Sequence, residues 1–272
     1  MDTELRAALA RLGLGWERHR RQDEGALLDL TAVVDYRSAI AAGGSGEPKI
    51  YEDSRRTGRD LGVLVLLDAT GSAAERSGHG ALFDEQRRLA GQLTAAFDQL
   101  GVRVATHAFY ARGRESIRML RVKDFGDRFD NRARARLHAL EPTGFTRLGA
   151  VFRHGAQLLS TRAGTSNLLM IVIGDGLPYD EGYADRYARE DSRRALSEAA
   201  DRGIACVGIA IGTSGVDGEA AQWVWAEAMR CVVRDSHQLA RVVPAVLGSA
   251  LRTAEARARH AGGGRSNRRK AL

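Results

Sequence analysis

The feature that most constrains this fold is a continuous apolar run, Leu61–Leu67, that stops at an acidic residue, Asp68. A short apolar run without alternation, bounded by turn residues, is typical of a strand buried on both faces of a parallel sheet. A second run has the same form and ends in Gly174-Asp175-Gly176. We therefore expect an α/β core in which carboxylates follow at least two buried strands.

Helical and strand-like segments alternate along most of the chain, which predicts a doubly wound, mostly parallel sheet flanked by helices. Apolar residues at three- and four-residue steps predict a helix from Leu82 to Leu100, closed by Gly101. Further strands are expected at 102–109, 116–122, 167–174, 204–211 and 231–234. Further helices are expected at 131–140, 147–159, 190–202, 219–229 and 237–256.

The two ends of the chain differ in composition from this middle part. Residues 1–58 are predicted to form a short helical N-terminal extension, with helices at Met1–Arg21 and Leu27–Ile40. Residues 59–257 would form the α/β domain. Residues 258–272, rich in Gly and Arg, would be a disordered basic tail.

The charge and the cysteines limit the class of protein. The net charge is +7, but arginine is scattered, so docking on an acidic protein is favoured over nucleic-acid binding, which remains a weaker alternative. Cys206 and Cys231 lie in apolar stretches without zinc-ligand spacing, which indicates two buried thiols. No apolar run has the length of a membrane span and the N-terminus does not resemble a signal peptide, so we expect a cytoplasmic protein.

The two strand-end carboxylates, Asp68 and Asp175, are the strongest candidates for a functional site. In one parallel sheet both would emerge at the same edge, where like charges repel unless a cation lies between them. The hydroxyls of Thr70 and Ser72 follow Asp68 closely, and Thr146 could add a third. Such hard oxygen ligands suit Mg²⁺ or another divalent cation. The simpler alternatives are a turn role for Asp68 and a helix N-cap role for Thr146.

An enzyme is the main alternative to a binding protein. A strand-end Asp could be a phosphoryl-accepting nucleophile in a Mg²⁺-dependent phosphoester hydrolase, but such enzymes place a second acid where Thr70 stands. We find neither a nucleophile elbow nor a phosphate-binding glycine loop after a strand. A hydroxyl-rich site without a general base leaves a metal position open for an outside carboxylate, which indicates binding and not catalysis.

These residues resemble the metal-ion-dependent adhesion site of von Willebrand factor A-type (VWA) domains. Asp68-x-Thr70-x-Ser72, Thr146 and Asp175 correspond to that site, with Thr70 where the family usually has Ser. More narrowly, the chain resembles the C-terminal half of NorD and CbbO proteins. The stretches that carry this likeness are Ile50–Asp60, Val122–Phe125, Gly144–Gly149 with Arg153-His154, Asp175–Asp180, Arg186-Tyr187 and Asp191–Arg193. Two departures stand out: Ala73-Ala74 replaces the usual Ser-Thr, and family members carry a long region ahead of this one.

The resemblance implies a role as accessory protein. NorD and CbbO proteins serve nitric oxide reductase and Rubisco together with a MoxR-type AAA+ ATPase, so it implies such an ATPase and a client enzyme as partners. The metal would hold a carboxylate of one of them.

A loop after the second metal-side strand is rich in Tyr and Arg, which are frequent in interface hot spots. We expect it to contact the partner through Tyr179, Asp180, Tyr183, Arg186 and Tyr187. The alternative is an ordinary surface loop. His154 could face the metal side, but a plain surface or packing role is favoured.

Overall fold

The structure is a computed structural model. It describes residues 3–11, 17–25, 27–45, 47–55, 60–71, 81–174, 177–211, 224–225, 229–233 and 241–253. The chain divides into two compact units, one of Met1–Leu12 with Asp60–Leu272 and one of Gly13–Arg59. Each unit is described by itself.

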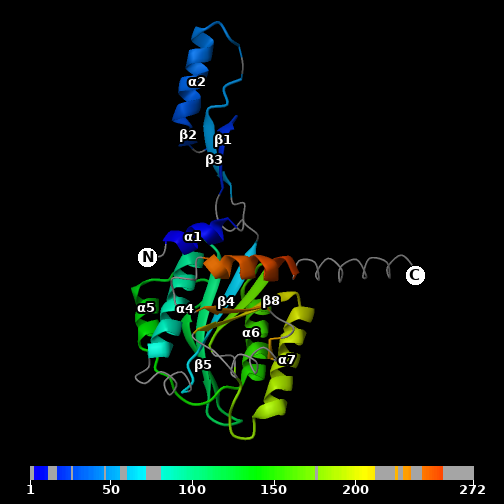
Figure 1. The fold of residues 1–272 in the computed structure, drawn as a ribbon. Helices are drawn as coiled ribbons and strands as arrows, with labels where there is room; N and C mark the ends of the chain where they lie inside the picture. The colour runs from blue at the N-terminus through cyan, green and yellow to red at the C-terminus, as the bar shows by residue number, and fades with distance from the viewer. Residues whose placement is uncertain are drawn as a thin grey trace, which may run out of the picture. The chain divides into compact units, whose positions relative to one another are not determined.

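The first unit is built on a six-stranded sheet with the order β6-β5-β4-β7-β8-β9 (Figure 1). Its strands are β4 (Leu61–Asp68), β5 (Arg103–Ala111), β6 (Ile117–Lys123), β7 (Asn167–Ile173), β8 (Ile204–Ile211) and β9 (Met229–Val233). Only the β5–β6 pair is antiparallel among these described strands, and the others run parallel. The expected mostly parallel α/β sheet is confirmed. Every residue of β4 and β8 is buried, which explains their unbroken apolar sequences.

Helices cover both faces of the sheet (Figure 1). On one face α4 (Ala81–Gln99) packs on β4 and β5, with α5 (Asn131–His138) beside it, and α1 (Thr3–Ala10) packs on α4. On the other face lie α6 (Leu148–Arg162) and α7 (Asp185–Asp201). Gly101 has a φ of 70°, so it ends α4 in the left-handed conformation predicted for it.

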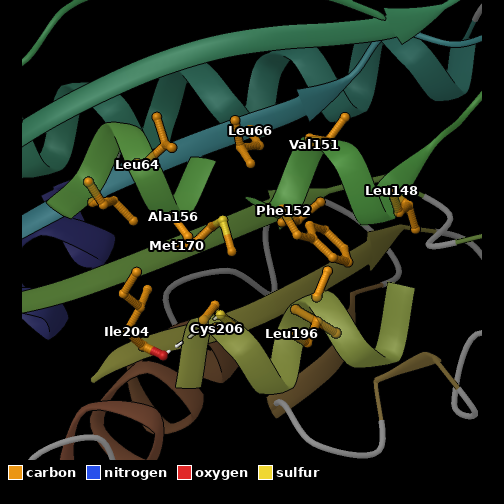
Figure 2. Packing of buried hydrophobic residues seen from close by; sticks show 14 of the residues in the cluster. Leu64, Leu66, Leu148, Val151, Phe152, Ala156, Met170, Leu196, Ile204 and Cys206 are labelled. Carbon is orange, nitrogen blue, oxygen red and sulfur yellow. Dashed lines mark hydrogen bonds between the residues drawn. The ribbon is translucent and has the colours of Figure 1, made fainter. Parts of the chain in front are cut away.

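The core under α6 shows how sheet and helix fit together (Figure 2). Leu64 and Leu66 of β4 and Met170 of β7 point toward Phe152 and Ala156 of α6. Gly155 makes this approach possible, because a Cβ there would lie 2.9 Å from the Met170 sulfur. The helix is therefore held close to the strands whose ends carry the candidate site.

The structure of residues 1–58, which belong partly to each unit, corrects the expected helical extension. In place of one helix over Met1–Arg21, the structure has α1 and a strand, β1 (Glu17–Gln22). This strand joins β2 (Leu27–Leu28) and β3 (Tyr51–Arg55) in an antiparallel sheet of order β1-β3-β2. The backbone partners of β1 come from a distant part of the chain, so helical periodicity could not reveal them.

The predicted second helix is present as α2 (Leu30–Ala41). Its N-cap is Asp29, whose side chain accepts hydrogen bonds from Thr31 and Ala32 at 3.2 Å.

Parts of the C-terminal prediction can be compared with the structure. The expected helix over Glu219–Met229 lies mostly outside the described residues, and Met229 itself begins β9. Residues 241–253 are helical, as predicted, while the expected tail over 258–272 lies outside the described residues. Among the helices that the structure describes, none is long and apolar enough to cross a membrane.

Candidate metal centre

Asp68 occupies the carboxyl end of β4 and is 3% exposed. Its Oδ1 atom accepts a hydrogen bond from the backbone N–H of Thr70 at 3.1 Å. This contact turns the chain tightly after the strand and keeps Thr70 next to the carboxylate in the turn. The turn role considered for Asp68 is therefore present, and it serves to assemble a cluster of oxygen atoms.

Thr146 completes the described part of this cluster. Its hydroxyl donates to the hydroxyl oxygen of Thr70 at 3.0 Å, and both side chains are buried. The N-cap of α6 is Arg147, without a side-chain capping bond, so Thr146 does not cap the helix. The structure thus brings Asp68, Thr70 and Thr146 together, although Thr146 is 76 residues from Thr70.

Backbone hydrogen bonds fasten the two loops that carry these hydroxyls. Gly71 N–H donates to Gly144 O at 3.1 Å, and Thr143 N–H donates to Ala69 O at 2.8 Å. Gly144 has a φ of 67°, and a Cβ there would lie 2.3 Å from Ala111 O. Only glycine fits this position, so the loop before Thr146 is held against both β4 and β5.

The second acidic strand end lies where the topology predicts. β7 runs parallel beside β4, with Leu67 paired to Ile173. A Cβ on Gly174 would lie 2.6 Å from Asp68 Cβ, so this glycine lets the end of β7 pack directly against the Asp68 side chain. Ser72 and Asp175, the remaining predicted ligands, lie outside the described residues.

The described oxygen atoms fit a small divalent cation. Oxygens at adjacent corners of an octahedron with bonds of about 2.1 Å lie about 3 Å apart. The Thr70 and Thr146 hydroxyls have that spacing, at 3.0 Å, beside a buried carboxylate. The donor set is all oxygen, which suits Mg²⁺ or Mn²⁺ better than the softer metals.

Arg147 follows Thr146 directly and was not among the predicted site residues. Its guanidinium pairs with Asp180, whose side chain is fully buried, and donates to Glu181 O at 2.8 Å. The same guanidinium lies 5.0 Å from the centre of the Tyr183 ring. A buried ion pair of this kind fixes the loop over residues 177–184 next to Thr146. Arg147 lies directly after Thr146 in the stretch Gly144–Gly149, one of those that carry the family resemblance. That position was the sequence signal from which a role for Arg147 could have been predicted.

Tyr183 extends this contact to the next helix. Its hydroxyl donates to Asp191 Oδ2 of α7 at 2.7 Å and accepts from Gly149 N–H of α6 at 3.2 Å. Burial raises the pKa of the Tyr183 phenol well above its usual range, so the group is a neutral donor. Asp191 also pairs with Arg153 at 2.8 Å. The loop after β7 is thus tied to both α6 and α7.

The five predicted partner-binding residues separate into two groups. Tyr179 and Tyr187 are 61% and 63% exposed, and Arg186 is also exposed. Asp180 and Tyr183 are 1% and 3% exposed, and their polar groups have partners within the chain. Direct contact at these two positions stays a prediction, but their placement indicates that they position the loop.

Phe145 is an exposed side chain that sequence reasoning missed. It is 45% exposed, lies between Gly144 and Thr146, and packs edge-on to Tyr179 with ring centres 6.0 Å apart. The sequence signal that could have identified Phe145 was an aromatic residue directly before the candidate ligand Thr146. His154 is exposed on α6, in keeping with a surface role.

Comparison with known proteins gives relatives for most of the chain, while no family model matches. It is 35% identical to protein NorD of Brucella suis over 191 residues, which cover 70% of this chain and 30% of that protein. It is 33% identical to an uncharacterised protein of Pseudomonas aeruginosa over 208 residues, covering 74% and 33%. The chain thus spans about a third of the length of these relatives.

Two solved structures share the fold. The manganese-loaded TRAP protein of Plasmodium vivax superposes with a TM-score of 0.52 at 13% identity, covering 71% of this chain and 74% of that one. The pilus adhesin SpaC of Lactobacillus rhamnosus GG, in its open conformation, gives a TM-score of 0.50 at 14% identity, covering 71% and 30%. At these identities the likeness is one of fold.

Proposed function

This chain contains a VWA domain of the NorD type, and from that premise we propose that it binds one divalent cation and uses it to hold a partner protein. The observation that carries the proposal is the buried hydroxyl pair of Thr70 and Thr146, 3.0 Å apart beside Asp68. Two buried threonine hydroxyls next to a strand-end carboxylate are oxygen donors of the kind that a small divalent cation prefers, which supports the proposal.

The proposed ligands are Asp68, Thr70, Ser72, Thr146 and Asp175. We favour Mg²⁺, and the manganese-loaded TRAP protein supports Mn²⁺ as a substitute. When bound, the cation supplies a Lewis-acidic position for a carboxylate from outside. The chain's own residues then orient the ion and leave that position open, which is a binding role without catalysis.

The surroundings of the site suit a protein partner. Phe145 and Tyr179 are exposed aromatics on loop segments beside Thr146, and the first turn of α7 adds the exposed Arg186 and Tyr187. Aromatic and Arg side chains around a charged centre are typical of interface hot spots. Arg147 and Asp180 hold these loops in place from within.

The finer proposal concerns the partner. Because the relatives are NorD proteins, we propose a MoxR-type AAA+ ATPase, with a client such as nitric oxide reductase or Rubisco, as the binding partners. This would place the protein in the cytoplasm as an accessory factor.

Cation binding is tested by thermal unfolding with Mg²⁺ or Mn²⁺ against EDTA. A ligand at about a hundred times its Kd stabilises the fold by about 2.7 kcal/mol, a shift of several degrees. The Thr146→Val variant keeps the shape but loses the hydroxyl, so it should lose the cation effect. The matched Thr146→Ser variant should retain it. An equal cation effect in both variants would remove Thr146 from the ligand set.

Partner binding is tested by capture of a purified MoxR-type ATPase in Mg²⁺ and in EDTA, with wild type and Asp68→Ala. We expect capture only by wild type with Mg²⁺. The same preparations are assayed for phosphoester hydrolysis. If the purified protein has a Mg²⁺-dependent turnover that Asp68→Ala abolishes, the hydrolase alternative replaces the adaptor proposal.

A further inference from the structure

A groove of about 440 Å³ lies between α4 and α5, two helices that run side by side on one face of the sheet (Figure 1). Its walls come from these helices and from Phe129, which precedes α5. Gly91, Ala95 and Ala96 make part of its lining small and apolar, and a Cβ on Gly91 would lie 3.1 Å from the Leu137 side chain. The groove contains none of the candidate metal ligands, so it is a separate surface.

Positive side chains outnumber acidic ones in the lining of this groove. Arg87, Arg88 and Arg134 line it, against a single lining acid, Asp84. Helix α5 reads Asn-Arg-Ala-Arg-Ala-Arg-Leu-His and contains no acidic residue. The pKa of its N-cap Asp130 is lowered mainly by hydrogen bonds from the Ala133 and Arg132 N–H groups, as expected of an N-cap carboxylate, with smaller effects from the charges of Arg132 and Arg136. The excess of positive charge at this helix therefore follows from its sequence.

Some of these arginines form hydrogen bonds and ion pairs within the fold, whereas others form no ion pair with a described carboxylate. Arg87 donates to His138 O at 2.6 Å and pairs with Asp84, so it ties α4 to the end of α5. Arg134 lies with its guanidinium 4.6 Å from the centre of the Phe129 ring. Among the described residues, no carboxylate forms an ion pair with Arg134 or with its exposed neighbours Arg132 and Arg136.

The stacked arrangement of Arg134 prepares it for a carboxylate. Stacking uses the flat face of a guanidinium and leaves the N–H groups on its edge available as paired donors. Arg88 is 60% exposed, and within the described part of the chain its ion-pair partner is Glu85, one turn earlier on α4, a contact of the weak surface type. The groove therefore presents donors at its rim and small apolar side chains in its lining.

We propose that the α4–α5 groove binds an acidic segment of a partner protein, with carboxylates on Arg88 and Arg134 and an apolar side chain over Gly91 and Ala95. The charge of the rim selects an acidic ligand. The apolar lining favours a peptide over a nucleic acid, which would need free aromatic faces for its bases, and the Phe129 face is already covered by Arg134.

This surface acts independently of the proposed cation site. Binding in the groove should persist in EDTA and in Thr146→Val, because no groove residue is a candidate ligand. A failure of one proposal is therefore distinguishable from a failure of the other.

The test measures the fluorescence anisotropy of a labelled peptide of alternating Glu and Leu residues, titrated with the full chain in EDTA. The groove variant is Arg88→Glu with Arg134→Glu. The control is Arg241→Glu with Arg252→Glu, which makes the same change in net charge at exposed positions of another helix. We expect the groove variant to bind at least about tenfold more weakly, and the control to bind like wild type.

Three results would overturn the proposal. Equal binding by wild type and groove variant would place the peptide elsewhere. If the control variant lost as much peptide binding as the groove variant, the effect would follow from net charge alone. Stronger binding of a single-stranded oligonucleotide than of the peptide, lost in the groove variant, would assign the groove to nucleic acid. Circular dichroism confirms that each variant is folded.

Discussion

At the scale of single residues, the candidate metal centre depends on glycines that let charged and polar groups approach. Gly144 lets its loop pack against the end of β5, and Gly174 lets the end of β7 pack against Asp68. Neither glycine carries a functional group. Both are required because any side chain would occupy the space that the neighbouring backbone or Asp68 already fills.

Replacing Gly174 with Ala tests this point. The new Cβ would lie 2.6 Å from Asp68 Cβ and 3.1 Å from Asp68 Oδ2, so one strand end must shift. We expect a loss of about 1–3 kcal/mol in unfolding free energy and a smaller thermal stabilisation by Mg²⁺. The control is Gly126→Ala, where a Cβ would have nothing within 4 Å. If Gly174→Ala kept the full cation effect, close packing at Asp68 would not matter to the site.

At the scale of elements, the loop over residues 177–184 is held by one buried ion pair and one tyrosine. Arg147 lies at the start of α6, Asp180 lies in the loop, and Tyr183 contacts Asp191 of α7. Gly149 permits this arrangement, because a Cβ there would collide with the Asp191 carboxylate. The exposed Tyr179 therefore lies on a supported loop, and the exposed Tyr187 lies in the first turn of α7, where its ring packs against Tyr183.

The Arg147–Asp180 pair can be measured by a double-mutant cycle. Arg147→Met should cost about 3–5 kcal/mol, because it leaves the fully buried Asp180 carboxylate without its cation. Asp180→Leu should be similarly destabilising, and the double variant should regain part of the loss. Urea unfolding of all four proteins gives the coupling energy. Additive losses in the double variant would show that the two side chains are not coupled.

At the scale of the whole molecule, stability should depend on pH through a buried histidine. Burial lowers the pKa of His107 from 6.5 to about 4; nearby positive groups, including His154, add to this, while Asp124 opposes it. His107 is 5% exposed, so it is neutral in the fold and charges mainly after unfolding. Its contribution to stability is complete above about pH 6.5 and is lost as the pH falls toward 4.

Urea unfolding near pH 7 and near pH 4.5 tests this dependence. The His107 contribution to the loss amounts to about 3 kcal/mol when it is complete. The pKa values of Asp130 and Glu198 are also lowered, but Asp130 is exposed and Glu198 is half-buried, and both lose their charge at a lower pH than ordinary carboxyl groups do. His107→Gln should flatten the acid loss, whereas His154→Gln, at an exposed position, should not. An unchanged pH dependence in His107→Gln would assign the loss to other groups.

Local patterns in the sequence predict the main architecture and the strand end at which Asp68 lies. Continuous apolar runs predict strands buried on both faces, and their ends predict where Asp68 lies. Helical periodicity predicted α4, and Gly101 predicted where it ends. These properties are local, since they depend on burial and backbone conformation over a few residues.

Which loops lie next to one another depends on the three-dimensional fold and could not be read from these local patterns. The hydroxyl bond between Thr70 and Thr146, the burial of Asp180 by Arg147 and the antiparallel partner of β1 each join residues far apart in the chain. Hydrophobic periodicity in the sequence does not indicate such pairings, because they follow from strand order and from the close packing that glycines permit. The pattern of residues thus places a carboxylate at a sheet edge, and the fold supplies the hydroxyls that make it a candidate metal centre.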